Sequence, residues 1–101
     1  MPGGDKKDAV KNTNSSGGFE KKEIDKEILR AGIIAECDAI NLYEQMASMT
    51  QSTDIKRILL DIAKEEKTHV GEFLTLLLRN DGEQRVELEQ GEKEVKELTG
   101  K

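Results

Sequence analysis

The sequence contains few of the residues that usually stabilise a small protein. Its 101 residues include one cysteine, one proline, one histidine, no tryptophan and only three other aromatic residues, while 37% are charged and 35% hydrophobic. The single cysteine, Cys37, cannot form an intrachain disulfide. The length corresponds to one domain, and so few aromatic side chains would pack a monomer thinly. The composition therefore indicates self-association.

Long apolar runs and an excess of basic residues are also absent. No stretch approaches the roughly 20 apolar residues that a membrane span needs, and no basic start followed by an apolar run indicates a signal peptide. The formal net charge of -5 and the pI near 5.0 disfavour nucleic acid as a partner, because phosphate binding needs clustered Lys and Arg. We expect a soluble cytoplasmic protein that binds neither membranes nor nucleic acid.

Helix-forming residues are abundant and occur in two long blocks. Residues 1–18 contain four glycines and almost nothing apolar, which predicts a disordered tail. Glu, Lys, Leu, Ile and Ala dominate the following block and predict a first helix over about 22–49. A second helix is predicted over about 53–79, with Thr53 or Asp54 as its N-cap. Because the connection is short, the two helices should lie antiparallel.

We therefore divide the chain into a tail (1–18), a helical hairpin (19–82) and a C-terminal segment (83–101). The last segment has a weakly amphipathic pattern interrupted by Gly91, which predicts a short third helix followed by a tail. No segment indicates a strand. The predicted fold class is all-α, an antiparallel two-helix hairpin plus a short C-terminal helix.

Each long helix has an apolar seam interrupted by ionisable residues. The seam positions follow alternating steps of four and three, which keeps them on one face. If the turn is centred near Gln51, Glu36 and Glu66 each lie 15 residues from it, so they should meet. The predicted seams are Leu29, Ile33, Glu36, Ile40, Tyr43 and Ala47 in the first helix, and Ile55, Leu59, Ile62, Glu66, His69, Phe73 and Leu76 in the second.

The polar seam residues form half of a known type of metal site. Unpaired buried carboxylates cost several kcal/mol, so they should take up a proton, form an ion pair or bind a cation. Ferritin-like dimetal bundles use a Glu from each of two helices and a Glu-x-x-His pair from each of two others. This chain supplies Glu36 and the pair Glu66 and His69. Two chains related by a two-fold axis would complete a four-helix bundle with a dimetal site at their interface.

Two other interpretations remain open at this point. A non-catalytic helical scaffold would use Glu36, Glu66 and His69 only to set the pairing register. A dimetal protein of different chemistry would keep the site but reduce peroxide instead of dioxygen. The two kinds of dimetal protein differ in their oxidant, whereas the scaffold predicts assembly without any dependence on metal.

Two motifs resemble those of the encapsulated ferritins, short ferritin-like proteins housed inside encapsulin shells. The segment 36–43 resembles the family's Glu followed seven residues later by Tyr, and Glu65-Glu66-Lys67-Thr68-His69 resembles its Glu-Glu-Lys-x-His. The resemblance covers about residues 28–80. The segments 66–73 and 94–100 are most similar to archaeal forms in which this domain is fused to the shell protein.

The resemblance implies a ferroxidase that oxidises Fe(II) with dioxygen and feeds iron to storage in an encapsulin nanocompartment in the cytoplasm. It implies that Glu36, Glu66 and His69 of two chains hold two Fe per dimer, and that dimers form a homodecameric ring with the encapsulin shell protein as partner. Iron would enter at positions matching Ala35 and Asp38, of which only Asp38 is acidic here.

Further side chains near the seams have both structural and functional interpretations. Tyr43 lies two turns after Glu36, so it either contacts a metal ligand or only fills the core. Cys37 is expected to be a small buried hydrophobic residue. Gly32 and Gly71 are unfavourable within helices, which indicates either close approach by another subunit or simple tolerance of glycine there. Met46 and Met49 are expected to be packing residues.

Overall fold

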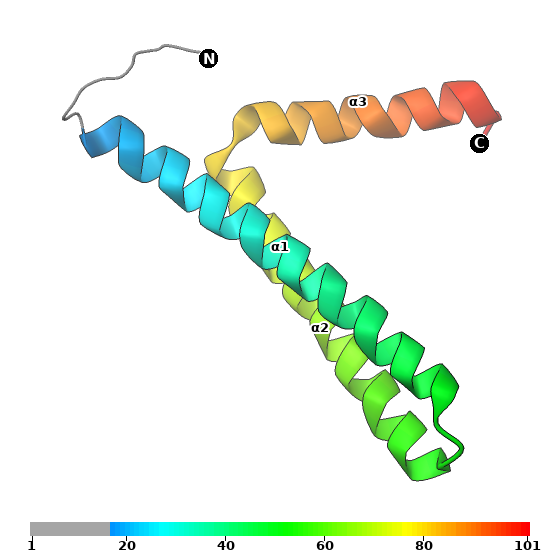
Figure 1. Ribbon diagram of the computed structural model, residues 1–101. Coiled ribbons are helices and arrows are strands. Elements are labelled where there is room, and N and C mark those ends of the chain that lie inside the picture. Colours follow the sequence, from blue (N-terminus) through cyan, green and yellow to red (C-terminus); the bar gives the residue numbers. More distant parts are fainter. Residues whose placement is uncertain (1–16) are drawn as a thin grey trace.

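The fold consists of three helices, two of which form an antiparallel hairpin (Figure 1). A computed structural model describes the backbone of residues 17–101 and the side chains of residues 23–101. The helices are α1 (Gly17–Met49), α2 (Thr53–Asn80) and α3 (Gly82–Thr99). No strand occurs in residues 17–101, so the predicted all-α class is confirmed. The predicted tail lies outside the described residues except for Gly17 and Gly18, which belong to α1.

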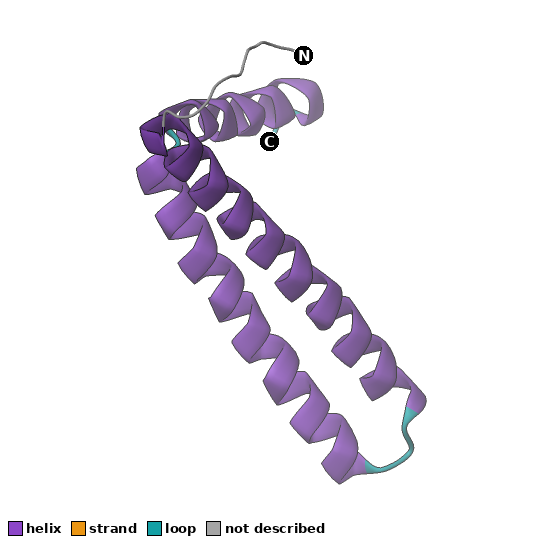
Figure 2. Ribbon diagram, turned by 60° about the vertical axis from the view of Figure 1, so that its left-hand side comes forward, coloured by secondary structure: helices purple, strands orange, loops and turns teal. Residues whose placement is uncertain are grey.

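The connection between α1 and α2 differs from the prediction in its capping residue. The side chain of Ser52 accepts a hydrogen bond of 3.2 Å from the backbone N–H of Ile55 and is the N-cap of α2. Thr53 and Asp54, the predicted caps, lie inside the helix. Ser52 has the extended backbone that a capping residue requires. The tight connection brings α1 and α2 side by side as a hairpin (Figure 2).

The interface between α1 and α2 follows the predicted seam of α1 closely, because all six seam residues are buried or half-buried. On α2 the seam departs from the prediction at both ends: Ile55 is 54% exposed at the start, and near the end Leu77 is 3% exposed but Leu76 is 45% exposed. A strict alternation of three and four residues drifts relative to a helix of 3.6 residues per turn. After three heptads the side chain facing α1 is therefore Leu77, and the prediction of Leu76 is wrong.

The two helices approach closely one turn from the polar seam residues. A Cβ atom placed on Gly32 would lie 3.0 to 3.2 Å from three ring carbons of Phe73. Gly32 thus accommodates a side chain of its own chain, which corrects the expectation that it faces another subunit. Gly71 has open space within 4 Å of its Cβ position in the single chain, so its expected contact with another subunit stays a prediction.

The third helix is longer than predicted and points away from the hairpin (Figures 1 and 2). Asp81 accepts a 3.0 Å hydrogen bond from the backbone N–H of Gln84 and a 2.9 Å bond from the guanidinium of Arg30 on α1. Arg85 donates to the backbone carbonyl of Leu78 at 2.7 Å. These polar contacts connect the start of α3 to both hairpin helices, while none of its residues is buried.

Many large apolar side chains of the described part of the chain remain uncovered. Only Ala47, Ala63 and Leu77 form a fully buried apolar core among residues 23–101. Those more than half exposed on the hairpin are Ile24, Ile28, Ile34, Leu42, Met49, Ile55 and Ile58. Among the described helices, none is long and apolar enough to cross a membrane. The single chain therefore has a small core and a large apolar surface.

Candidate metal centre

The candidate centre lies midway along the hairpin, where an acidic residue of α1 faces a Glu-x-x-His pair of α2. Glu36 comes from α1, and Glu66 and His69 come from successive turns of α2. The side chains of Glu36 and Glu66 are 19% and 17% exposed, and that of His69 is 45% exposed. The antiparallel register therefore places the three predicted ligands together, as the equal distance of Glu36 and Glu66 from Gln51 predicts.

Both carboxylates converge on one imidazole nitrogen. Nδ1 of His69 lies 2.8 Å from Oε2 of Glu36 and 2.7 Å from Oε1 of Glu66. An imidazole Nδ1 carries at most one hydrogen, so it can donate a full hydrogen bond to only one of the two oxygens. The other carboxylate oxygen lies beside the same nitrogen with no hydrogen atom between them. This arrangement concentrates negative charge at a point where a cation would be stabilised.

The protonation of His69 responds to these neighbours. Burial alone would lower its pKa, but the hydrogen bonds and negative charges of Glu36 and Glu66 outweigh burial and raise the pKa of His69 above its ordinary value. In the metal-free protein the two carboxylates thus favour the charged imidazolium. A metal ion bound by the imidazole would have to displace that proton, because only neutral histidine is a ligand.

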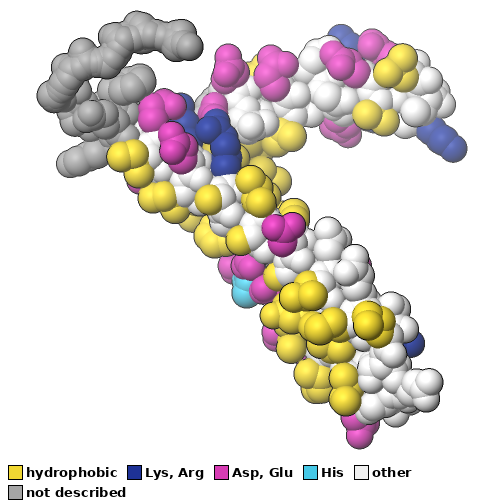
Figure 3. Space-filling view, viewed as in Figure 1, with side chains coloured by type: hydrophobic (Ala, Val, Ile, Leu, Met, Phe, Trp, Pro, Cys, Tyr) yellow, Lys and Arg dark blue, Asp and Glu magenta, His cyan; other side chains and the backbone are white. Residues whose placement is uncertain are grey.

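The donor set fits a hard or borderline divalent cation. One ligand atom from each of Glu36, Glu66 and His69 lies within 4.8 Å of the other two. Carboxylate oxygens together with an imidazole are a ligand set used for Fe, Mn and Zn. In the space-filling view the histidine lies among acidic side chains at the edge of the hairpin, with hydrophobic side chains on both sides along the helices (Figure 3). The group is therefore open at a surface that is otherwise apolar.

The remaining predicted site residues are not part of this group. Asp38 is exposed on α1, and the group of described residues that could hold a metal ion does not include it. Tyr43 is half-buried, and no hydrogen bond in residues 23–101 joins its hydroxyl to Glu36, Glu66 or His69. Both interpretations of Tyr43 stay predictions. Cys37 is exposed rather than buried in the single chain, because the helix turns it away from the α1–α2 seam.

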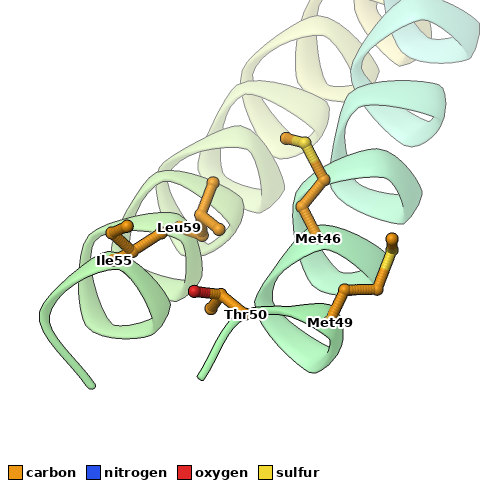
Figure 4. A pocket seen from close by; sticks show the side chains of 5 residues that line it. All are labelled: Met46, Met49, Thr50, Ile55 and Leu59. Atoms are coloured by element: carbon orange, nitrogen blue, oxygen red, sulfur yellow. The ribbon is translucent and has the colours of Figure 1, made fainter. Parts of the chain in front are cut away.

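The turn end of the hairpin contains a hollow that the sequence pattern does not reveal. It measures about 370 Å³ and is open to solvent, and Figure 4 shows the side chains that line it: Met46, Met49, Thr50, Ile55 and Leu59. Met49 is 79% exposed in the single chain, so its expected packing role is not fulfilled within one hairpin and stays a prediction. The hollow lies away from the candidate metal ligands and extends the apolar surface of the hairpin.

One contact that shapes the centre was missed by sequence reasoning. The ring of Phe73 lies against Gly32 one turn from the contact between His69 and Glu36. The signal that could have identified this contact is a glycine in the middle of a long helix. The glycine lies opposite an aromatic residue at the same level of the neighbouring helix.

Comparisons with known proteins agree with this architecture. The family model described as Rubrerythrin matches residues 27–101. The chain is 60% identical over 82 residues to the ferritin-like-encapsulin shell fusion protein of Pyrococcus furiosus, covering 81% of this chain and 24% of that protein. It is 43% identical over 56 residues to the encapsulin nanocompartment cargo protein EncC of Myxococcus xanthus, covering 55% and 43% of the two chains.

A solved structure supports the same relationship. The encapsulated ferritin domain from Pyrococcus furiosus superposes with a TM-score of 0.78 at 53% identity, covering 92% of this chain and 90% of that one. The chain spans about a quarter of the length of the fusion protein and less than half of the cargo protein. The sequence resemblance to encapsulated ferritins, including the archaeal fused form, is confirmed. The chain therefore belongs to the rubrerythrin family, with the ferritin-like fold of the encapsulated ferritins.

Proposed function

We propose that this protein is a ferroxidase, which oxidises Fe(II) to Fe(III) with dioxygen at a di-iron site shared by two chains. The observation that carries the proposal is the convergence of the Glu36 and Glu66 carboxylates on Nδ1 of His69. Membership of the rubrerythrin family and similarity to an encapsulated ferritin domain support an iron-related, ferritin-like function. The finer assignment to ferroxidase chemistry rests on the donor set and on the pairing of two chains about a two-fold axis.

The three side chains would act as ligands for the iron substrate. Glu36 and Glu66 would supply oxygens to bridge or chelate the ions, and His69 would supply a nitrogen as a terminal ligand. The two Fe(II) of the site would lose one electron each, and dioxygen would take up both electrons together with two protons from water to form hydrogen peroxide. The negative charge of the carboxylates favours the product, since Fe(III) carries one more positive charge than Fe(II). Anionic ligands thus make the oxidised state more stable relative to the reduced one.

A second chain would complete the site. One chain offers two carboxylates and one imidazole, which is half of the ligand set of a ferritin-like dimetal bundle. The half-exposed His69 and the uncovered apolar residues of α1 and α2 lie on the hairpin where a partner could cover them. Pairing two hairpins about a two-fold axis would build the four-helix bundle and bind two irons per dimer.

We extend the proposal to assembly and location. Dimers would form a ring of ten and work inside an encapsulin nanocompartment in the cytoplasm, with the shell storing the ferric product. Similarity to a shell fusion protein and to an encapsulin cargo protein supports this location. Asp38, an exposed residue of α1 two positions after Glu36, would assist iron entry.

The decisive experiment compares ligand variants with a matched control. Glu36→Ala and His69→Ala should each abolish oxygen consumption on anaerobic loading with Fe(II) followed by exposure to air. Glu27→Ala, which removes an exposed carboxylate of the same helix α1, should behave like wild type. Oxygen uptake and the absorbance of Fe(III) measure the reaction, and native mass spectrometry counts irons per oligomer.

The outcomes separate the proposal from its alternatives. Even-numbered oligomers that bind two irons per dimer and then consume oxygen support the ferroxidase. Oligomers that form without stoichiometric metal would instead support a scaffold in which Glu36, Glu66 and His69 set the register. Faster turnover with peroxide than with dioxygen would identify a peroxide-reducing dimetal protein.

A further inference from the structure

We infer that Gly32 and Phe73 form a positioning pair that sets the separation of α1 and α2 at the candidate metal centre. The inference rests on the proposed metal-binding function of Glu36, Glu66 and His69. Neither residue of the pair is itself a candidate metal ligand. It acts by fixing how closely the two helices approach where the ligands must meet.

The register places this pair beside the ligands. Gly32 lies four residues before Glu36 on α1, and Phe73 lies four residues after His69 on α2. Residues four apart are neighbours on one helix face. In an antiparallel hairpin the two offsets compensate, so the contact between Gly32 and Phe73 lies one helical turn, about 5.4 Å, from the contact between Glu36 and His69.

The contact at Gly32 leaves no room for a larger residue. A Cβ atom there would lie 3.0 Å from Cε2, 3.1 Å from Cδ2 and 3.2 Å from Cζ of Phe73, which is tighter than ordinary packing. Either the half-buried ring or the α1 backbone would have to shift by a few tenths of an ångström. Since a helix is stiff over one turn, a shift of the backbone at position 32 would be transmitted to Glu36.

The ligand group has little tolerance for such a shift. The distances from Nδ1 of His69 to the two carboxylates are already 2.8 and 2.7 Å, within the normal range for a hydrogen bond. Metal–ligand distances vary by only about 0.2 Å in a well-formed site. Glu66 and His69 share α2 and would move together, whereas Glu36 reaches them only across the interface. Widening the hairpin at this level should therefore weaken the contribution of Glu36.

Glycine at position 32 is unfavourable for the helix itself. Alanine is a better helix former, so replacing Gly32 by Ala should not unfold α1. Its position opposite the Phe73 ring, one helical turn from the candidate ligands, explains why glycine occupies position 32. Gly91 provides the comparison, because it also lies within a helix, on α3 away from the candidate ligands, and has nothing within 4 Å of its Cβ position.

The test measures binding of Co(II), a spectroscopic probe, to the full-length protein. Gly32→Ala should bind Co(II) about 10-fold or more weakly than wild type, the usual cost of disturbing a residue that positions a ligand, and its d–d spectrum should change. The thermal midpoint of the metal-free variant should not fall. Gly91→Ala should bind Co(II) like wild type.

A compensating substitution makes the test specific. Phe73→Leu removes ring volume, so Gly32→Ala combined with Phe73→Leu should recover Co(II) affinity and spectrum relative to Gly32→Ala alone. Unchanged affinity in Gly32→Ala, an equal loss in Gly91→Ala, or no recovery in the double variant would overturn the inference. Absence of stoichiometric Co(II) binding by wild type and Glu36→Ala alike would instead contradict the proposed function.

Discussion

At the scale of single residues, the hairpin depends on a few charged groups placed where apolar contacts are sparse. Asp81 is 7% exposed, caps α3 through Gln84 and pairs with Arg30 of α1. His69 is held between Glu36 and Glu66 in a similar way. In both cases a buried or half-buried charge is stabilised by a partner from another part of the chain, Arg30 for Asp81 and Glu36 for His69. These groups therefore control local geometry more than they contribute to a hydrophobic core.

Asp81 should make the stability of the fold depend on acidic pH. The hydrogen bond from the Gln84 backbone lowers its pKa, burial opposes this, and the positive charges of Lys26 and Arg30 lower the pKa further, so the folded value is below the ordinary 3.8. A lowered folded pKa means that the ionised carboxylate stabilises the fold above the unfolded pKa. This contribution is lost as the pH falls through the folded pKa.

The measurement compares thermal unfolding of wild type and Asp81→Asn. Asparagine is an equally good N-cap, so this variant removes the charge while keeping the cap. The thermal midpoint of the variant should be lower than that of wild type at pH 7, and the difference should shrink below pH 3.8. A difference that stays constant down to the acid transition would show that the pair with Arg30 does not contribute.

At the scale of helices, residue spacing predicts the elements better than their ends. The long helices, the short connection and the seam of α1 follow from composition and period, and so does the meeting of Glu36 with Glu66. The capping residue does not, because Ser52, Thr53 and Asp54 all have side chains suited to capping. Which of them caps depends on the backbone path of the turn, and that path is set by the packing of α1 against α2.

The cap of α2 offers a test at this scale. Ser52→Ala removes the acceptor for the Ile55 N–H and should lower the free energy of unfolding by about 1 kcal/mol. Ser48→Ala is the control, because Ser48 donates to the Gln45 carbonyl inside α1, where alanine is a favourable replacement. Chemical denaturation measures both. An equal loss in the two variants would contradict the assignment of Ser52 as the cap.

At the scale of the whole molecule, one chain does not bury enough apolar surface to be a satisfactory monomer. Three small or medium side chains form the fully buried apolar core of residues 23–101, while the hairpin and α3 leave many isoleucines, leucines and valines exposed. Such a surface indicates association, because uncovered apolar patches of this extent mark interaction sites. The sparse core and the incomplete set of candidate metal ligands both lead us to expect association with a second chain.

The stability of the assembled protein should depend on its concentration. For a dimer that unfolds with dissociation, each tenfold increase in chain concentration adds about 1.4 kcal/mol to the apparent free energy of unfolding. Thermal midpoints should therefore rise with concentration. Leu42→Glu, at a 51% exposed position of α1, should convert the oligomer to monomer in sedimentation velocity.

The matched control for association is Glu27→Leu, which replaces an exposed glutamate of α1 by leucine and so reverses the chemical change made in Leu42→Glu. It should leave the oligomer intact. A thermal midpoint independent of concentration, together with an unchanged sedimentation coefficient for Leu42→Glu, would contradict association through this face.

The sequence by itself determined the all-α class, the hairpin, and the common height of Glu36, Glu66 and His69, because helix periodicity and a short turn are local properties. Three other features depend on the packed helices: Leu77 replaces Leu76 in the seam, Phe73 fills the space beside Gly32, and Asp81 connects the start of α3 to Arg30 of α1. These features depend on how two helix surfaces fit together over several turns. A contact between residues distant in sequence is specified by that fit and not by any local pattern.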